Sequence, residues 1–370
     1  MVPIARRYLL SDKPRVTISA GGVAFAVLLI VLMLALYRGI YDQAGRFATS
    51  APSELWVRQA GSADPSHGAS ILDNSVLAQL TDVPGVAAAQ PLFARTMLIG
   101  TSPLEGSYAL VVSIPEGPLF AATTESFGVP SMPGPGQIIL SDPVAQKVGA
   151  GAGDTVYIGS SALKVGEVSS LIDSAFSAMV VVSPADAAPL FRNSGAFSFA
   201  LVALEAQADP ARVESTIEAM VPGTNAATRE QFAGALRREV EEGFLPIVAV
   251  LGAVAFVVGL SVIALTIYTS TVERVRDYGV LKAVGASSGQ LFSIVLRQSV
   301  IVTLLGYALG VLLAVGAGSL LADAVPEFTT LYRWQDILVV LGAAVIMSVV
   351  AAIVPIRKVA LVDPTMVFRA

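Results

Sequence analysis

Four long runs without a charged residue constrain this chain more than any other feature of its sequence. They cover residues 16–37, 243–272, 298–322 and 337–356, which are 22, 30, 25 and 20 residues long. An α-helix needs about 20 apolar residues to cross the hydrocarbon core of a bilayer. The sequence therefore predicts four transmembrane helices. Because the first run is longer than the roughly 7–15-residue apolar region of a signal peptide, we interpret it as a retained helix.

The composition agrees with a membrane protein and excludes several classes of function. Hydrophobic residues make up 54% of the 370 residues and charged residues only 14%, whereas soluble domains carry about 25% charge. A net charge of −5 excludes a basic nucleic-acid-binding protein. The chain has no cysteine and one histidine, His67, so disulfides, thiolate metal sites and multi-histidine metal sites are excluded.

The distribution of lysine and arginine predicts the orientation in the membrane. Segments 1–15, 273–297 and 357–370 carry four, four and three basic residues, whereas segment 323–336 carries one basic and three acidic residues. The positive-inside rule places the first three segments in the cytoplasm. Segment 323–336 is then an external loop. The long segment 38–242, with 11 basic and 21 acidic residues, is then extracytoplasmic.

Segment 38–242 has the pattern of a folded α+β domain. Short β-like runs bounded by turn residues cover 54–58, 94–99, 108–114, 137–140, 155–158, 162–168, 178–182 and 197–204. Helical periodicity covers 74–80, 210–220 and 229–242, and Asp209 before Pro210 is a good helix N-cap. Strands mixed with a few helices predict an α+β domain inserted between the first two membrane helices.

A helical stalk is predicted where this domain meets the second membrane run. The helix 229–242 reaches that run with only Gly243 and Pro246 as breaks. Glu239, Glu241 and Glu242 lie just before it. Three carboxylates could bind a cation or haem iron, but a solvated helix face on a rigid stalk is the simpler interpretation.

No catalytic residue is predicted in this chain. There is no G-x-x-x-x-G-K-[ST] sequence, so the chain cannot hydrolyse ATP through a P-loop. The glycine-rich run 149–153 precedes a strand and predicts a turn rather than a phosphate site. His67 lies in a polar run that is typical of a solvated loop, and no metal site is predicted.

The most informative segment joins the second and third membrane runs. Residues 273–287 read ERVRDYGVLKAVGAS. A charged helix is expected to pass the membrane, break at Gly285 and restart at Ser287 or Ser288, which are good N-caps. Such an elbow could dock into the groove of a partner, or it could be an ordinary solvated hairpin. The candidate coupling residues are Glu273, Arg274, Arg276, Asp277, Gly279 and Gly285.

This segment resembles the ER-x-x-E-[IY]-G-x-L-[RK]-A-[IV]-G-A-S sequence of MacB/FtsX/LolC-type permeases of ABC transporters. Asp277 stands where that family usually has glutamate. Residues 355–364, PIRKVALVDP, resemble the family's C-terminal sequence, and VPGV at 83–86 and GDTV at 153–156 match shorter family landmarks. One helix, a large external domain and three further helices is the family layout. Residues 3–43 look most like the DevC-like branch, which lacks a fused ATPase domain.

The resemblance implies a multi-pass permease of the bacterial plasma membrane with both termini in the cytoplasm. It implies a homodimer bound to two copies of a separate ABC ATPase subunit, with ATP and Mg²⁺ in that partner and no cofactor in this chain. A membrane-fusion or other extracytoplasmic protein is a further candidate partner. Gly306 and Gly310 form a small-xxx-small pair that predicts close helix packing, although a lipid-facing glycine-rich helix has the same pattern.

Three functions remain open at this point. The first is export or extraction of a hydrophobic or lipid-linked molecule, driven by mechanical transmission to the external domain. The second is an FtsX-like regulatory role, in which the external domain activates a cell-wall hydrolase or relays a signal. The third is export of haem or an amphipathic toxin. The absence of charge within all four apolar runs argues against a proton-coupled transporter or an ion channel.

Overall fold

The structure is a computed structural model that describes most of the chain. The described residues are 13–62, 70–114, 117, 119, 123–124, 129, 131–169, 179–190, 196–324 and 329–360. The chain divides into two compact units. The membrane unit comprises residues 1–38, 244–324 and 330–370, and the external unit comprises residues 39–243 and 325–329. His67 lies outside the described residues.

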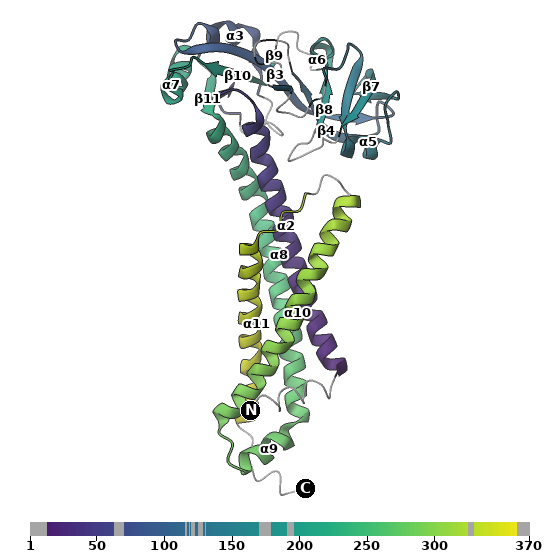
Figure 1. The fold of residues 1–370 in the computed structure, drawn as a ribbon, viewed down its shortest axis with the longest axis vertical. Helices are drawn as coiled ribbons and strands as arrows, with labels where there is room; N and C mark the ends of the chain where they lie inside the picture. The colour runs from purple at the N-terminus through teal and green to yellow at the C-terminus, as the bar shows by residue number, and fades with distance from the viewer. Residues whose placement is uncertain are drawn as a thin grey trace. The chain divides into compact units, whose positions relative to one another are not determined.

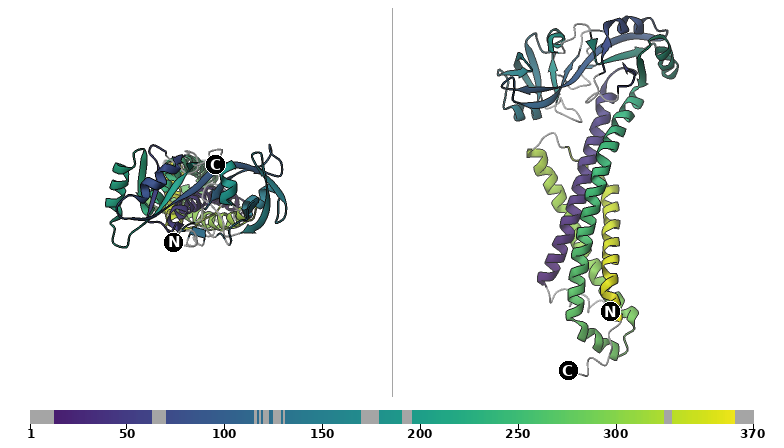
Figure 2. Two further views of the ribbon diagram at one scale, coloured as in Figure 1. Left: turned by 90° about the horizontal axis from the view of Figure 1, so that it is seen from above. Right: turned by 180° about the vertical axis from the view of Figure 1, so that it is seen from behind.

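Four helices of the described chain are long and apolar enough to cross a membrane. They are α2 (Lys13–Ser50), α8 (Arg229–Glu273), α10 (Ser288–Ala324) and α11 (Trp334–Ala360). This confirms the four transmembrane helices expected from the sequence. In the membrane unit they form a bundle (Figures 1 and 2), whose core contains Val27 of α2, Ile263 of α8, Ala314 of α10 and Ala344 of α11.

The helices α2 and α8 are longer than the uncharged runs that predict them. The helix α2 continues to Ser50. The helix α8 begins at Arg229 and remains helical at Gly243 and Pro246. The uncharged run marks where hydrocarbon can surround a helix, whereas backbone hydrogen bonding sets where the helix ends. Residues of both units therefore belong to the same two helices.

The external unit contains a nine-stranded mixed sheet with the order β11-β1-β10-β3-β4-β8-β5-β7-β6. Its strands are β1 (Leu55–Gln59), β3 (Val86–Gly100), β4 (Ser107–Ser113), β5 (Gln137–Ser141), β6 (Thr155–Ile158), β7 (Ser161–Ser169), β8 (Met179–Val182), β10 (Phe199–Leu204) and β11 (Thr224–Thr228). A second small sheet pairs β2 (Leu72–Asp73) with β9 (Ala196–Phe197). The predicted α+β class is confirmed.

One half of the large sheet closes into a small barrel. Strand β6 pairs back with the end of β3, with Ile99 opposite Ile158, so that the six strands from β3 to β6 form a closed ring. Alternate residues point into its interior, as the two-residue period of a strand requires. Ile138 and Leu140 of β5, and Val180 and Val182 of β8, are all fully buried in this core.

The other half of the sheet carries two helices on one face. The helix α3 (Asn74–Thr81) contacts β3, and α7 (Pro210–Met220) contacts β11. Leu80, Val213 and Ile217 of these helices pack against Leu55 and Val57 of β1. The predicted N-cap is confirmed, because the Asp209 side chain accepts a hydrogen bond from the Ala211 amide.

Several features of the external unit were not expected from the sequence, among them the two-residue strand β2. The helices α5 (Asp142–Val148) and α6 (Pro184–Leu190) are only seven residues long, too short for a helical period to stand out. Strand β11 has the weakly hydrophobic sequence TNAAT. The predicted strand 197–204 is divided, since Phe197 belongs to β9, which pairs with β2, whereas β10 pairs with β1 and β3. Between them, the Ser198 hydroxyl binds the backbone of Ala94.

Candidate functional site

The elbow joining α8 and α10 is a packed structure. It contains a short helix, α9 (Val275–Ala283), at one end of the membrane bundle (Figure 1). Tyr278 of α9 is 2% exposed and packs against Leu291 and Val295 of α10. Burial of a large aromatic side chain fixes the orientation of α9 against the start of α10. A simple solvated hairpin would lack this small core.

Gly285 ends α9 in a backbone conformation that favours glycine. Its φ angle is +101°. The Gly285 amide donates to the Lys282 carbonyl at 3.1 Å and the Ala286 amide to the Leu281 carbonyl at 2.9 Å. These two bonds form a Schellman motif, which satisfies the last carbonyl groups of a helix. A Cβ atom on Gly285 would meet no atom within 4 Å, so the requirement for glycine comes from the backbone angle.

A capping box then starts α10. The Gln290 amide donates to the Ser287 hydroxyl at 3.3 Å, and the Ser287 amide donates to the Gln290 side-chain oxygen at 3.0 Å. Reciprocal bonds of this type satisfy two free amide groups at a helix N-terminus. Of the two serines proposed as N-caps, Ser287 makes these bonds. The elbow is thus ordered on both sides of Gly285.

The elbow presents charge to its surroundings. Glu273, Arg276 and Asp277 are exposed, Arg274 is half-buried, and Gly279 is buried beside Tyr278. The outer side of α9 therefore carries the charged side chains of Arg276 and Asp277 beside the exposed Val280, while its inner side packs on α10. This arrangement suits docking of a partner through a surface that combines charged and apolar groups, and the coupling role of these residues stays a prediction.

Gly306 and Gly310 lie where α10 approaches α2. A Cβ atom on Gly306 would be 2.6 Å from Cβ of Val23, and one on Gly310 would be 2.6 Å from the carbonyl oxygen of Ala24. Both distances are too short for ordinary packing, so the backbones can approach this closely only because glycine has no side chain. On the side of α10 that faces α11, the Ser348 hydroxyl donates to the Ser299 hydroxyl at 2.9 Å.

The stalk carboxylates lie on the part of α8 that belongs to the external unit. Glu241 and Glu242 are exposed and Glu239 is half-buried. In the described part of the chain, no three His, Asp or Glu side chains are grouped as metal ligands. Nearby, the Arg237 guanidinium lies 5.9 Å from the centre of the Tyr41 ring and against Gly45, both on α2. These contacts hold α2 and α8 together within the external unit.

Sequence reasoning missed an ion pair at the end of the membrane bundle where α11 begins. Arg38 Nε and one of its terminal nitrogens donate to the two carboxylate oxygens of Asp336 at 2.9 and 3.0 Å. The pair is partly buried, with 29% and 17% of the two side chains exposed. A signal was present, because Arg38 is the first charge after the first apolar run and Asp336 the last before the fourth.

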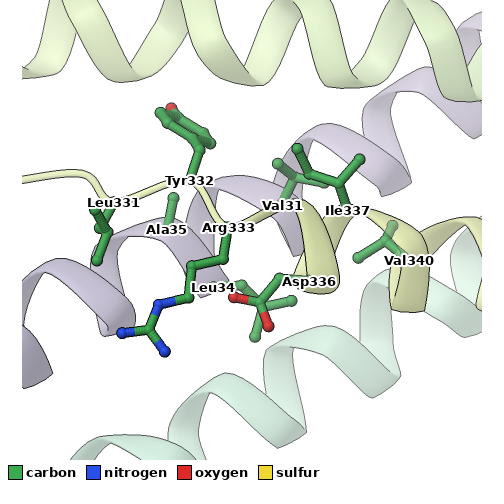
Figure 3. A pocket seen from close by; sticks show the side chains of 9 residues that line it. All are labelled: Val31, Leu34, Ala35, Leu331, Tyr332, Arg333, Asp336, Ile337 and Val340. Carbon is green, nitrogen blue, oxygen red and sulfur yellow. The ribbon is translucent and has the colours of Figure 1, made fainter.

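The segment before α11 is held to two other helices close to this ion pair. The Leu331 amide donates to the Ala35 carbonyl of α2 at 3.0 Å. The Tyr332 hydroxyl donates to the Ala314 carbonyl of α10 at 2.9 Å, and burial raises the pKa of this hydroxyl. Figure 3 shows the small recess that this segment closes, lined by Val31, Ala35, Ile337 and Val340.

These features together define an integral membrane protein of the permease class, with four transmembrane helices and a large extracytoplasmic α+β domain between the first two. The model of the MacB-like periplasmic core domain matches residues 16–220, and that of the FtsX-like permease C-terminal region matches residues 249–364. The chain belongs to the MacB/FtsX-type permeases of ABC transporters.

Relatives with similar sequences agree with this assignment. The chain is 24% identical over 369 residues to an uncharacterized ABC transporter permease of Mycobacterium bovis, covering 95% of this chain and 94% of that one. It is 26% identical over 163 residues to the macrolide export ATP-binding/permease protein MacB of Agrobacterium fabrum, covering 42% and 25%. The periplasmic region of MacB from Actinobacillus actinomycetemcomitans matches with a TM-score of 0.33 at 9% identity, covering 52% and 94%.

Proposed function

We propose that this permease couples ATP hydrolysis by a separate ATPase subunit to the export or extraction of a hydrophobic or lipid-linked molecule. In this proposal two copies of the chain form a homodimer in the bacterial plasma membrane, with both termini in the cytoplasm. Each copy binds one ATPase subunit, which supplies the ATP and Mg²⁺ chemistry. The membership of the chain among ABC transporter permeases supports the need for such a partner.

The observation that carries the proposal is the construction of the elbow. A docking element must keep its shape when it is pushed, and α9 is fixed by the buried Tyr278, the Schellman motif at Gly285 and the capping box at Ser287. Since α9 connects directly to α8 and α10, a displacement of α9 moves the ends of two membrane helices. Charged residues on its outer side offer partner contacts that screening by salt would weaken.

Transmission to the external domain is proposed to follow α8 and α2. Both helices contain residues of the membrane unit and of the external unit. A continuous helix transmits displacement along its axis because its turns are hydrogen-bonded to one another. In α8, Pro246 has no amide hydrogen to donate to the Glu242 carbonyl, so this one bond is missing. In this mechanism the chain moves its substrate by changing the position of the external domain and contributes no catalytic group.

The test is assembly with an ATPase. The permease and its genomically adjacent ABC ATPase would be co-expressed, purified together and reconstituted into lipid vesicles. We expect a stable complex whose ATP hydrolysis exceeds that of the isolated ATPase. Substitution of Tyr278 by alanine should reduce both the stability of the complex and the stimulation of ATP hydrolysis, since the core of the elbow is lost. An ATPase that neither binds nor responds to the wild-type permease would overturn the proposed function.

A further inference from the structure

Four aromatic rings from four different elements meet in the external unit. Trp56 of β1 stacks on Phe232 of α8, with ring centres 4.7 Å apart and planes 22° apart. Phe199 of β10 meets Trp56 edge-on at 5.7 Å and 72°, and Phe47 of α2 lies 5.7 Å away at 47°. We call these four residues the Trp56 cluster. Trp56, Phe199 and Phe232 are 2% exposed or less.

The Trp56 cluster lies on the sheet face opposite to α3 and α7. Along β1, Leu55 and Val57 point into the core that those helices cover. Successive side chains of a strand point to opposite faces, so Trp56 points to the other face, where it meets Phe47 and Phe232. This half of the sheet is therefore held between α3 and α7 on one side and the ends of α2 and α8 on the other.

Hydrogen bonds reinforce the contact of Trp56 with both helix ends. The indole N–H of Trp56 donates to the carbonyl of Ala48 at 3.2 Å. Ala48 is in the last turn of α2, where helix carbonyls lack partners within the helix. Arg229, the first residue of α8, donates from its side chain to the Ala51 carbonyl and from its amide to the Glu54 carbonyl, both at 3.2 Å.

We infer that Trp56 is the positioning residue that fixes the α2–α8 pair to the β1–β10 half of the sheet, so that movement of the helices moves the external domain. This inference rests on the proposed function. Aromatic rings that meet in edge-on and stacked geometries set an orientation as well as a distance. An aliphatic side chain could fill the same space without fixing the angle between the helices and the sheet.

The first experiment measures the rigidity of this joint without any partner. The chain contains no native cysteine, so cysteines introduced at Arg238 of α8 and Ala219 of α7, both exposed, can be spin-labelled selectively. We expect a narrow distribution of label distances in the wild-type background and a broad one in Trp56→Ala. Trp56→Phe should stay narrow, because it keeps a ring against Phe232 while losing the bond to Ala48. An unchanged distribution in Trp56→Ala would overturn the inference.

The second experiment measures transmission in the permease–ATPase complex in lipid vesicles. A single label at Ala219→Cys in each copy reports the separation of the two external domains before and after adding ATP with vanadate. We expect a shift in the wild type and in Trp56→Phe, and loss of the shift in Trp56→Ala while ATP hydrolysis continues. Leu140→Ala is the control, since Leu140 is equally buried but belongs to the barrel core.

The outcomes separate this inference from the proposed function. Loss of the shift in Trp56→Ala but not in Leu140→Ala supports the inference that Trp56 fixes the two helices to the sheet. A shift retained in Trp56→Ala, or lost equally in Leu140→Ala, overturns it and leaves the ATP-coupled permease intact. If the wild-type complex shows no ATP-driven shift, mechanical transmission is wrong and Trp56 has no such role, even where the first experiment finds a rigid joint.

Discussion

Gly285 lies in the left-handed region of backbone conformation at the end of α9. A non-glycine residue held in such a region costs about 1–3 kcal/mol, but Asn is better tolerated there than a β-branched residue. We therefore expect Gly285→Val to disturb the elbow and reduce ATPase binding and stimulation, and Gly285→Asn to stay near wild type. Co-purification and ATP hydrolysis measure both effects. Full coupling in Gly285→Val would remove this turn from the mechanism.

The ion pair between Arg38 and Asp336 gives a second prediction at this scale. Hydrogen bonds to charged groups contribute about 1.5–3 kcal/mol, and partial exposure reduces this. We expect Arg38→Met to destabilise the membrane unit by about 1–2 kcal/mol, seen as a lower Tm of the purified protein. The double variant Arg38→Asp with Asp336→Arg should recover only part of the lost stability. It restores an ion pair, but it places a positive charge in the first turn of α11, where a negative charge is favoured.

A matched control for this ion pair lies on α2 itself. Arg46 and Asp42 form a pair at 3.4 Å with 60% and 42% of their side chains exposed. Exposed pairs of this kind contribute about 0–1 kcal/mol, so Arg46→Met should change the Tm little. An equal loss in the two variants would show that the Arg38–Asp336 pair has no special stabilising role.

The surroundings of two glycines on α10 predict where this helix tolerates a larger side chain. Gly310 faces the Ala24 carbonyl of α2, whereas a Cβ atom on Gly316 would meet no atom within 4 Å. We expect Gly310→Ala to force α10 and α2 apart at a cost of about 1–3 kcal/mol, which is typical of overpacking, and Gly316→Ala to be neutral or stabilising by up to about 1 kcal/mol, since alanine is favoured over glycine inside a helix. Thermal stability of the two variants in the same detergent tests this, and equal stability would contradict the close contact.

The stalk predicts the effect of a flexible insertion. Four glycines inserted after Glu242 soften α8, because each interior glycine costs a helix about 1 kcal/mol relative to alanine. We expect ATPase assembly and basal ATP hydrolysis to continue while the ATP-driven movement of the external domain is lost. Four alanines at the same point keep the helix stiff with the same added length. If both insertions behave alike, stiffness of α8 is not what transmits the movement.

The sequence predicts where the helices and strands of this protein lie better than it predicts which of them contact one another. The four apolar runs, eight strand segments and the turn at Gly285 each have a local chemical signature, and the structure contains all of them. The Arg38–Asp336 pair joins residues 298 positions apart, and the Trp56 cluster depends on which strands are neighbours. Local patterns do not show which elements are neighbours; for the ion pair the sequence shows only that a charge borders each of the two apolar runs. Strand β11 was missed for the same reason, because its pairing with β1 and not its own hydrophobicity makes it a strand.

For the whole molecule, the distribution of basic residues predicts the orientation across the membrane. A reporter enzyme that is active only outside the cytoplasm should work when inserted near Ser66, which lies outside the described residues. The same reporter should fail near Ser288, at the start of α10. A cytoplasmically active reporter at the two sites should give the opposite result. Activity of the first reporter near Ser288 would reverse the orientation and the proposed role of the elbow.

Strand β3 also imposes an order on how the external unit is assembled during synthesis. Its first residues pair with β10 and its later residues with β4. The barrel strands all lie between Val86 and Val182, so this half can close early, since contacts near in sequence form fastest. Strand β1 must wait for β10 and β11, and β11 directly precedes α8. Until β10 and β11 have been synthesised, β1 lacks its partner strands and is open to aggregation. Because β11 ends where α8 begins, completion of the sheet and insertion of the second membrane helix are adjacent steps in synthesis.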